Sequence, residues 1–375
     1  MKAFIEANKE QMYQTLMELC AIPAPSHFEH QRAAYCKKWL EDIGAKGVYI
    51  DEALNVILPI NCEGSDKITV FAAHTDTVFP DMEPMPYIDD GVRIHSPGVG
   101  DDTASVAVLL NVAKYYVENH IQPPHGVMFV LDSCEEGLGN LKGMRQLFKD
   151  YDGRIAQFIT LDGRFENVAN VCVGSHRYEV EVLTEGGHSY AMFGNRNAIA
   201  ELSRIVNDIY AIELPKIGNS KTTYNVGSIS GGTSVNTIAQ SAKMLCEYRS
   251  DNAQCLATMQ AHFERIFEAA RQRVLDLRVT LVGERPCMGD VDFAKIDRLA
   301  EIYSGVVKDI LNIDVARKSG STDCNIPLSL GIPAICIGVW QGGGSHTREE
   351  WIEKASLPLG LEVALRVVAD ILKEA

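Results

Sequence analysis

Three apolar runs of strand length, separated by helical segments, constrain the fold of this chain more than any other feature. They read KITVFAAH (67–74), GVMFVLD (126–132) and IAQFITLD (155–162). Apolar residues that continue without alternation indicate a strand covered on both faces. Segment 101–120, between the first two runs, has apolar residues at helical spacing. Strands that alternate with helices in this way predict an α/β fold, with a mostly parallel sheet covered by helices on both faces.

The chain changes character near residue 176 and returns to the α/β style after residue 285. Segment 176–187 alternates apolar and polar residues, as an antiparallel strand with one solvated face does. Further strand and helix patterns follow, up to RVTLVGE (278–284). We therefore predict an α+β domain at 176–284, inserted into a catalytic domain that is formed by 1–175 and 285–375.

Composition limits the kinds of partner and environment. The 375 residues include 35 basic and 50 acidic side chains, so the net charge is -15, and no long run of Lys or Arg occurs. This argues against nucleic acid as a partner. We find no apolar signal-peptide core and no run of about 18 apolar residues, so we expect neither export nor a membrane span. The ten cysteines lack a CxxC motif, which favours reduced thiols in a cytoplasmic protein.

Histidines and carboxylates follow several of the predicted strands directly. In an open α/β sheet, ligands bind outside the carboxyl ends of the strands, which meet at one edge. A helix that begins at DDTASV (101–106) starts at this edge, and the late strand ICIGVW (335–340) runs through glycines toward a further histidine. The residues expected to converge are His74, Asp76, Asp101, Glu135, Glu136, Asp162 and His346.

Such a cluster predicts a metal site. Bare carboxylates a few ångströms apart raise one another's pKa values, so a cation has to lie among them. Imidazole and carboxylate ligands without a thiolate favour zinc, with cobalt or manganese as alternatives. The set exceeds one tetrahedral site, and two divalent ions bridged by one carboxylate fit it. His74 and Asp76 face the same side of an extended segment, which suits a ligand histidine whose second nitrogen is held by a carboxylate.

These residues also have simpler interpretations. A His-x-Asp pair at a strand end is usually a surface pair, adjacent glutamates are usually solvated, and Asp162 before a glycine could be a turn residue. Asp102 is predicted to cap the helix that follows it. His27 and His30 have the spacing of a metal-binding pair, but no strand end or acid cluster accompanies them, so we interpret them as helix surface.

Eight short motifs, in order along the chain, resemble those of a known enzyme family. They are HTD, GVGDDTAS, EEG, LDG, GGHS, GGTSVN, YRSD and GGGSHTREEW. The set resembles the co-catalytic di-zinc exopeptidases and deacylases, which include peptidase T, glutamate carboxypeptidase, acetylornithine and succinyl-diaminopimelate deacylases and carnosinase-like dipeptidases. The resemblance spans nearly the whole chain, including the inserted segment. Each motif alone is weak, but eight in order are specific.

The resemblance implies a role for each predicted metal ligand. Asp101 would bridge two divalent ions. His74 and Asp162 would complete one site, and Glu136 and His346 would complete the other. The implied mechanism uses a metal-bridged hydroxide, since a bound metal lowers the pKa of water to about 7.

The remaining residues of these motifs have implied supporting roles. Glu135 would be the general base, and Asp76 would be the carboxylate behind His74. A cis peptide bond is usual after the bridging acid, which places it here between Asp101 and Asp102. Many members have a lysine where this chain has Thr103, a departure that leaves the ligands intact.

The resemblance also implies substrate contacts. The inserted domain serves in the family as a lid or dimerisation domain, and it would supply His188 to stabilise the oxyanion, in its own subunit or in the partner of a homodimer. Asn236 and Arg249 would hold a substrate carboxylate, which suits the bidentate guanidinium. Arg249 could instead pair with Asp251. Ser319 of the SGSTD motif would line the substrate pocket.

The expected activity is hydrolysis of short peptides from the N-terminus. Within the family, aspartate at the position of Asp162 tends to accompany aminopeptidases and dipeptidases, and glutamate there accompanies carboxypeptidases and deacylases. We therefore predict a tripeptidase-like aminopeptidase, with an N-acyl-amino-acid deacylase or a carboxypeptidase as the alternative. A catalytically silent binding protein is a more distant alternative, because the base and all ligands are present. No GxSxG motif or phosphate-binding loop points to another enzyme class.

Overall fold

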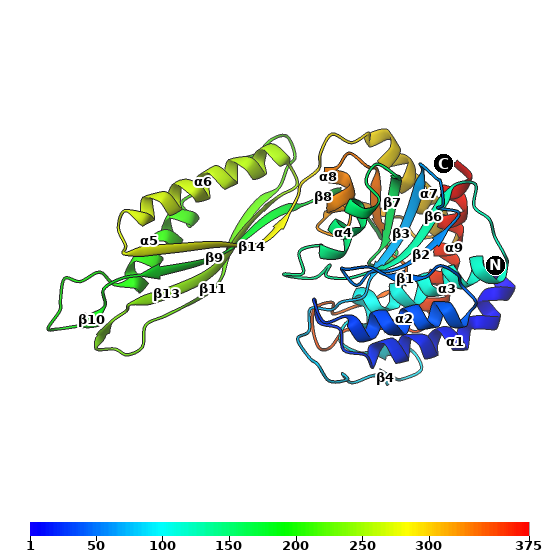
Figure 1. Cartoon of the computed structure of the whole chain (residues 1–375), viewed down its shortest axis with the longest axis horizontal. Coiled ribbons are helices and arrows are strands. Elements are labelled where there is room, and N and C mark those ends of the chain that lie inside the picture. Colours follow the sequence, from blue (N-terminus) through cyan, green and yellow to red (C-terminus); the bar gives the residue numbers. More distant parts are fainter. Residues whose placement is uncertain (375) are drawn as a thin grey trace. The chain divides into compact units, whose positions relative to one another are not determined.

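The computed structural model describes residues 1–374, which divide into two compact units (Figure 1). Unit 1 comprises Met1–Cys172 and the residues from Gly289 onward, and unit 2 comprises Val173–Met288. Unit 1 is therefore built from both ends of the chain, and unit 2 from one continuous segment between them.

An eight-stranded sheet forms the centre of unit 1. Its strands are β1 (Tyr49–Ile50), β2 (Val56–Ile60), β3 (Ile68–His74), β6 (Gly126–Asp132), β7 (Ile155–Leu161), β8 (Asn167–Cys172), β15 (Ala316–Gly320) and β16 (Ala334–Ile337). The strand order is β1-β2-β6-β3-β7-β16-β8-β15. The central neighbours β6, β3, β7 and β16 run parallel, as do β8 and β15. The remaining pairs are antiparallel.

Helices flank this sheet, which confirms the predicted α/β class. They are α1 (Lys2–Cys20), α2 (His30–Asp42), α3 (Ser105–Glu118), α4 (Lys142–Asp150), α7 (Phe293–Leu311), α8 (Asn325–Ser329) and α9 (Ser356–Glu374). α1 and α3 pack on α9, and α7 packs on α9 and β16. Figure 1 shows α4 and α8 on the side of the sheet opposite α1, α2 and α3. Because both faces are covered, β3 and β6 are buried along their whole length, as their unbroken apolar sequences require.

A second, small antiparallel sheet in unit 1 has the order β17-β18-β5-β4. Its strands are β4 (Ile88–Asp89), β5 (Arg93–His95), β17 (Gly342–Gly343) and β18 (Trp351–Glu353). The turn η1 (Val99–Ala104) follows β5 and contacts β18. The sheet thus holds the loop between β17 and β18, which carries His346, beside the turn that carries Asp101. This small sheet is absent from the sequence-based prediction.

Unit 2 consists of a four-stranded antiparallel sheet, two helices and a short ribbon. Its elements are β9 (Gly174–Leu183), β10 (Gly187–His188), α5 (Ala198–Tyr210), β11 (Thr222–Gly231), β12 (Thr237–Ile238), β13 (Ser241–Ser250), α6 (Ala253–Arg271) and β14 (Asp276–Arg285). The sheet order is β11-β13-β9-β14, and β10 pairs with β12. Buried residues alternate along β13 because the two helices cover only one face of the sheet.

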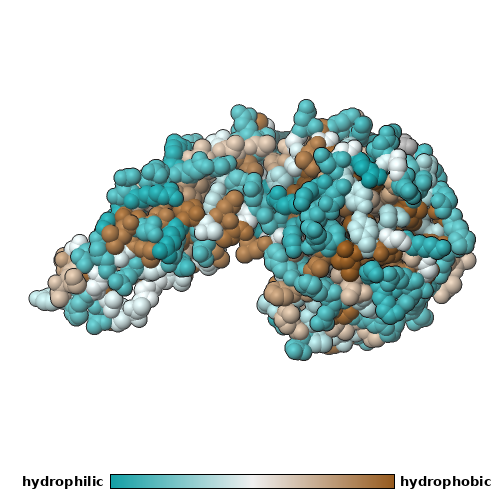
Figure 2. All heavy atoms as spheres, in the orientation of Figure 1, coloured by the Kyte–Doolittle hydropathy of each residue, from teal (hydrophilic) through white to brown (hydrophobic). Residues whose placement is uncertain are grey.

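Apolar side chains reach the surface of unit 2, where they appear as brown patches (Figure 2). Tyr190 and Phe193 follow β10 and are 88% and 91% exposed, and Val235, which precedes β12, is fully exposed. Large apolar groups exposed together commonly mark a surface that contacts another molecule.

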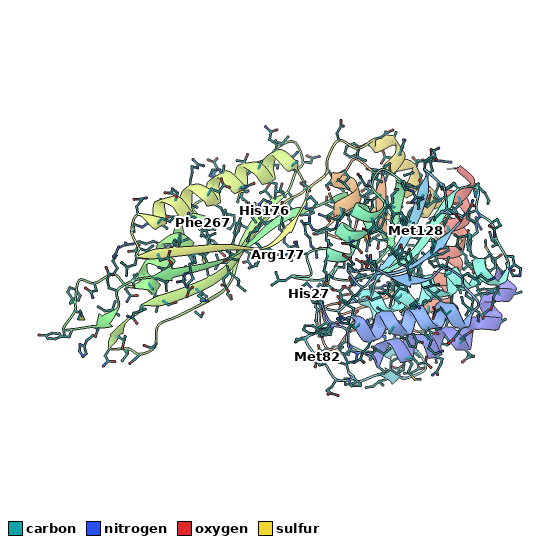
Figure 3. All side chains as sticks on the ribbon, viewed as in Figure 1. His27, Met82, Met128, His176, Arg177 and Phe267 are labelled. Carbon is teal, nitrogen blue, oxygen red and sulfur yellow. The ribbon has the colours of Figure 1, made fainter. Side chains whose placement is uncertain are left out.

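The core of unit 2 is rich in aromatic rings. Phe267 of α6, labelled in Figure 3, packs edge to face on Tyr178 of β9, with ring centroids 5.7 Å apart. The phenol of Tyr248 on β13 hydrogen-bonds to Nδ1 of His176 on β9. Burial lowers the pKa of His176. These contacts tie α6 to the two central strands.

Candidate metal centre

The order of the central strands brings the predicted ligands to one edge of the sheet. β3 lies between β6 and β7, and all three run in the same direction. β3 ends at His74, β6 is followed by Glu135 and Glu136, and β7 is followed by Asp162. Side chains that are far apart in the sequence therefore meet outside the carboxyl ends of adjacent strands, where open α/β sheets bind their ligands.

Asp101 lies between the two predicted ligand histidines. Its Oδ1 is 3.1 Å from Nε2 of His74, and its Oδ2 is 3.0 Å from Nε2 of His346. Nε2 of His346 is also 3.1 Å from Oε1 of Glu136. One carboxylate that presents a separate oxygen to each of two imidazoles has the arrangement required of a ligand that bridges two ions.

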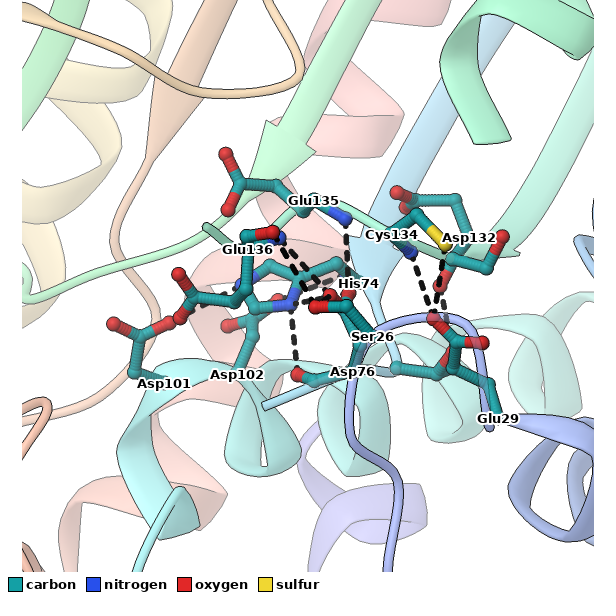
Figure 4. Close-up of polar contacts among 12 residues, drawn as sticks. Ser26, Glu29, His74, Asp76, Asp101, Asp102, Asp132, Cys134, Glu135 and Glu136 are labelled. Atoms are coloured by element: carbon teal, nitrogen blue, oxygen red, sulfur yellow. Dashed lines mark hydrogen bonds and ion pairs between the residues drawn. The ribbon is translucent and has the colours of Figure 1, made fainter. Parts of the chain in front are cut away.

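The remaining predicted ligands complete the cluster, of which Figure 4 labels His74, Asp101 and Glu136. Three groups of ligand atoms each lie within 4.8 Å of one another: His74 with Asp102 and Asp162, His74 with Glu135 and Glu136, and Asp101 with Glu136 and His346. Glu135 and Glu136 are each only 5% exposed. The structure thus brings together every predicted ligand of unit 1.

The pKa values of these groups are shifted by burial and by the close approach of several carboxylates. Burial raises the pKa of Glu136 to about 7, with a further contribution from Asp101. Burial and the neighbouring Asp101 also raise the pKa of Asp162 well above its usual range. Hydrogen bonds with Asp101 and Glu136 raise the pKa of His346 to about 11. Carboxylates packed this closely suit divalent cations, and the oxygen and imidazole donors fit such ions.

Asp76 is fully buried and holds the segment that carries the two glutamates. Its Oδ1 accepts a hydrogen bond from the backbone N–H of Glu135 at 2.9 Å, and its Oδ2 accepts one from that of Glu136 at 3.0 Å. Nδ1 of His74 lies 3.4 Å from Oδ1 of Asp76 and 3.1 Å from its backbone carbonyl oxygen. Asp76 therefore contacts both the ligand histidine and the glutamate segment, and the second contact was not anticipated from the sequence.

Two residues before α2 also hold this segment, and sequence reasoning missed both of them. Ser26 donates a hydrogen bond to Oδ2 of Asp76 at 2.6 Å. Glu29 is fully buried, and its Oε1 accepts hydrogen bonds from the backbone N–H and the thiol of Cys134, at 3.0 and 3.2 Å. Cys134 has a positive φ of 59°, a strained conformation for a residue with a side chain. Glu29 thereby stabilises the bend that directs Glu135.

The interpretation of His27 and His30 as helix surface is wrong for His27. α2 begins at His30, and His27 lies in the preceding turn with a φ of 76°. Its backbone N–H donates to Glu29 at 3.0 Å, and its Nδ1 is 3.3 Å from Sγ of Cys134. His27 is labelled in Figure 3. The hydrogen bond from the N–H of Phe28 to the carbonyl oxygen of Pro25 closes a turn here and delays the helix.

Glu350 is a third residue of the site that the sequence did not reveal. Its buried carboxylate accepts three backbone hydrogen bonds, from Gly98 at 2.7 Å, Gly100 at 2.9 Å and Asp101 at 2.8 Å. A Cβ at Gly100 would lie 2.9 Å from Oε1 of Glu350, so only glycine allows this approach. The position of Glu350 within GGGSHTREEW was the available signal, but a charged residue in a polar loop is ordinarily solvated.

The prediction that Asp102 caps a helix is also wrong. α3 begins at Ser105 and has no side-chain cap, while Oδ2 of Asp102 accepts the backbone N–H of His74 at 3.2 Å. The non-helical backbone at Asp101 and Asp102 turns this side chain toward β3 instead. The peptide bond between the two aspartates is cis, as the resemblance implied.

A cavity of about 250 Å³ lies beside the acids. Asp101 and Asp162 form one part of its wall, and the predicted pocket residue Ser319 forms another. The cavity lies entirely within unit 1. A substrate with its reacting carbonyl at the acids would therefore have room for an adjacent group.

The other predicted substrate residues belong to unit 2. His188 is on β10, where its Nδ1 accepts the backbone N–H groups of Tyr190 and Ala191, each at 3.3 Å. Asn236 immediately precedes β12, and its backbone carbonyl accepts the N–H of Ser189 at 2.9 Å. The ribbon thus fixes both residues next to each other.

Arg249 lies on β13 and forms a bidentate pair with Glu247. Its Nε and Nη2 donate to Oε1 and Oε2 of Glu247 at 2.8 and 3.0 Å. The guanidinium of Arg177 on β9 donates to the same carboxylate at 3.3 Å. The acid partner of Arg249 is therefore Glu247, in place of the Asp251 considered from the sequence.

Comparison with known proteins identifies relatives over nearly the full length of the chain. Succinyl-diaminopimelate desuccinylase from Corynebacterium glutamicum is 24% identical over 341 residues, which cover 88% of this chain and 89% of that protein. A tripeptidase from Staphylococcus aureus has a similar fold, with a TM-score of 0.77 and 21% identity over 98% of this chain and 99% of that one. A dinuclear metal-binding peptidase from Bacillus subtilis has a TM-score of 0.68 and 14% identity, over 99% of both chains.

The same comparison identifies the family. The sequence profile of peptidase family M20/M25/M40 matches residues 70–370, a span that contains His74, Asp101 and His346 as well as the whole of unit 2. It begins within β3 and ends within α9, so it covers most of unit 1 too. The chain is therefore a hydrolase of peptidase family M20/M25/M40.

Proposed function

We propose that this protein removes residues from the N-terminus of short peptides, with two divalent metal ions as cofactors. The observation that carries the proposal is the placement of Asp101, with one oxygen toward His74 and the other toward His346. Zinc is the ion that this set of imidazoles and carboxylates favours, with cobalt and manganese as substitutes. The ten cysteines are buried free thiols, which supports a reducing, cytoplasmic environment.

The proposed ligands divide between two sites that share Asp101. His74 and Asp162 serve one ion, and Glu136 and His346 serve the other. When bound, such ions lower the pKa of water and polarise a substrate carbonyl. Asp102, whose buried Oδ1 has no hydrogen-bond partner among residues 1–374, places a further carboxyl group behind His74, and burial raises its pKa well above the usual range. This surplus of carboxylates supports two ions in preference to one.

Glu135 is the proposed general base. It is held beside the cluster by the hydrogen bond from its backbone to Asp76, and its side chain is largely shielded from bulk water. A carboxylate in this position can take a proton from the attacking water and pass it to the leaving amine. General acid–base catalysis of this kind contributes a rate factor of roughly 10² to 10⁴.

Unit 2 supplies the proposed substrate contacts. Because Nδ1 of His188 accepts backbone hydrogen bonds, the proton of a neutral imidazole resides on Nε2, which can donate to an oxyanion. Asn236 and Arg249 are proposed to hold a substrate carboxylate. The exposed side chains of Tyr190, Phe193 and Val235 support a homodimer formed through this unit.

An N-acyl-amino-acid deacylase is the second candidate. The desuccinylase relative covers 88% of the chain, which favours this alternative over unrelated hydrolytic activities. We prefer the aminopeptidase because an aspartate, Asp162, follows β7 where deacylases and carboxypeptidases of the family tend to have a glutamate. An aminopeptidase requires a free amine on the residue that precedes the bond that is cut, and a deacylase does not.

The test is a substrate panel assayed after chelation and after addition of zinc, cobalt or manganese. Free tripeptides and dipeptides are compared with the same peptides after N-acetylation and with N-acetyl and N-succinyl amino acids. The proposal expects cleavage of free peptides that is lost with the chelator and restored by metal. Glu135→Ala should retain the metal but lose activity. Cleavage of only the acylated substrates would establish the deacylase, and full activity of the metal-free protein would disprove both.

A further inference from the structure

The cavity beside the metal centre is lined by cationic as well as acidic side chains. Asp101 and Asp162 belong to its wall, and so do Lys318 and Arg164. Arg164 forms an ion pair with Glu166, in which Nε is 3.3 Å from Oε1. Lys318 is exposed, and its ammonium group has no hydrogen bond or ion pair with any residue among 1–374. The cavity is therefore lined by one positive charge that has no acid partner in the described chain.

Strand register explains why Lys318 faces this space. Lys318 on β15 lies opposite Ala169 on the neighbouring, parallel strand β8. Side chains two residues apart share a face of the sheet, and Asn167 and Ala169 both line the cavity. The register shifts between Lys318 and Ser319, and both Ser319 and Gly320 line the cavity as well. An alanine and a glycine beside the lysine leave the room that the cavity occupies.

The cavity also contains polar groups that lack partners. The indole N–H of Trp340, a side chain only 2% exposed, has no hydrogen-bond acceptor within residues 1–374. Oδ1 of Asn167 is likewise buried and unpaired in the described chain. This oxygen is an acceptor, so it suits a donor group of a ligand. Buried polar groups without partners are costly, so a ligand that bonds to them would be favoured.

We propose that this cavity binds a carboxylate of the substrate, through the ammonium of Lys318 and the indole N–H of Trp340. The proposal rests on the proposed function and adds a substrate class to it: peptides that carry an acidic group next to the bond that is cut. The carboxylate could come from an aspartate or glutamate side chain or from the C-terminus of a dipeptide. A lysine without an acid partner, in a protein with a net charge of -15, marks this preference.

The test compares matched pairs of dipeptides that differ in a single charge. Glu-Ala against Gln-Ala and Ala-Glu against Ala-Gln vary the side chain at each position, and Ala-Ala against Ala-alaninamide varies the terminal carboxylate. The wild-type protein should favour the charged member of one pair. Lys318→Met, which keeps the length of the side chain, should reduce kcat/KM for that member about tenfold, as expected for one charge-assisted hydrogen bond. The uncharged member should change little.

Further variants make the assignment specific. Lys318→Arg should retain the preference and Lys318→Glu should reverse it, while the exposed Lys295→Met serves as a control for general loss of positive charge. Binding of glutamate and glutamine to the metal-loaded protein, measured by calorimetry, should show the same dependence on Lys318. Equal effects of Lys318→Met on both members of every pair would overturn the proposal. Absence of all peptide cleavage would count against the proposed function, and calorimetry would still decide the role of this cavity.

Discussion

The carboxylate of Glu350 accepts a hydrogen bond from the backbone N–H of Asp101, over a donor–acceptor distance of 2.8 Å. The same carboxylate accepts the N–H groups of Gly98 and Gly100, so it fixes the whole turn that presents Asp101 to the two histidines. In Glu350→Gln, an NH₂ group replaces one of the two accepting oxygens. In either orientation of the amide, this NH₂ group would face a backbone N–H that needs an acceptor. We expect metal affinity to fall by about 10- to 100-fold, the usual effect of losing a partner behind a metal ligand. Competition with a chromophoric chelator measures this metal affinity.

Glu349→Gln is the matched control, because Glu349 is next to Glu350 in the sequence and its carboxylate is exposed. Equal metal affinity in both variants would show that Glu350 does not position Asp101. A loss of affinity in Glu350→Gln alone, without a change in the melting temperature of the metal-free protein, would place the effect at the metal site.

Replacement of Glu29 should separate catalysis from metal binding. In Glu29→Ala, the backbone N–H and thiol of Cys134 lose a buried acceptor, which costs about 1–3 kcal/mol of stability. The bend at Cys134 that directs Glu135 then loses one support, while Asp76 still holds the backbone of Glu135 and Glu136. We therefore expect kcat to fall while KM and metal content stay near the wild-type values. Kinetics and metal analysis of the same preparation provide the measurement.

His30→Ala serves as the control for Glu29, since His30 is an exposed residue at the start of the same helix. Glu29→Gln should be milder than Glu29→Ala because its amide oxygen can still accept the hydrogen bonds. If Glu29→Ala lost metal and activity in the same proportion, the residue would be part of the metal site and would have no separate effect on Glu135.

Metal binding should release protons. In the metal-free protein the pKa of His346 is raised to about 11, so its imidazole is protonated at pH 7.5. The raised pKa stabilises the folded protein fully below pH 6.5, and this stabilisation is lost as the pH rises toward 11. A metal ligand must be neutral imidazole, so binding displaces this proton. The pKa of Glu136, about 7, adds a second displaced proton at pH 6. Affinity for zinc should therefore increase from pH 6 to pH 8.

Calorimetry in buffers of low and high ionisation enthalpy counts the released protons. His346→Ala should release about one proton fewer for each ion bound at the site that it serves. Proton release that is unchanged in this variant, or a zinc affinity that falls as the pH rises, would contradict the assignment of His346 as a ligand.

The sequence was sufficient for features that depend on local patterns. β3 and β6 could be predicted because burial on both faces leaves a continuous apolar run, and the parallel order of strands then places His74 and Glu136 at one edge. The strands β8 and β15 were missed. β15, which reads ARKSG, is largely exposed, so its residues follow no strand-like pattern of hydrophobicity.

Contacts between distant segments could not be predicted in the same way. Glu29 meets Cys134 across 105 residues, and Glu350 meets Asp101 across 249 residues, so no local pattern indicates either pair. The local rule failed at Asp102, where an aspartate ahead of a helix normally caps it. Here the backbone leaves the helical conformation, and the side chain bonds to His74 instead.

Mixing of two inactive variants should show whether His188 acts in its own subunit or in its partner. Glu135→Ala removes the proposed base, and His188→Ala removes the proposed oxyanion donor. If His188 acts across a homodimer, a mixed dimer contains one complete site, made from Glu135 of one chain and His188 of the other. Random exchange of a symmetric dimer should then restore about a quarter of the wild-type activity.

If His188 acts within its own chain, every site in the mixture lacks one group and activity stays at the level of the separate variants. Exchange has to be verified by mass spectrometry of the native dimers. A monomer at the assay concentration, with full activity, would exclude the cross-subunit role directly.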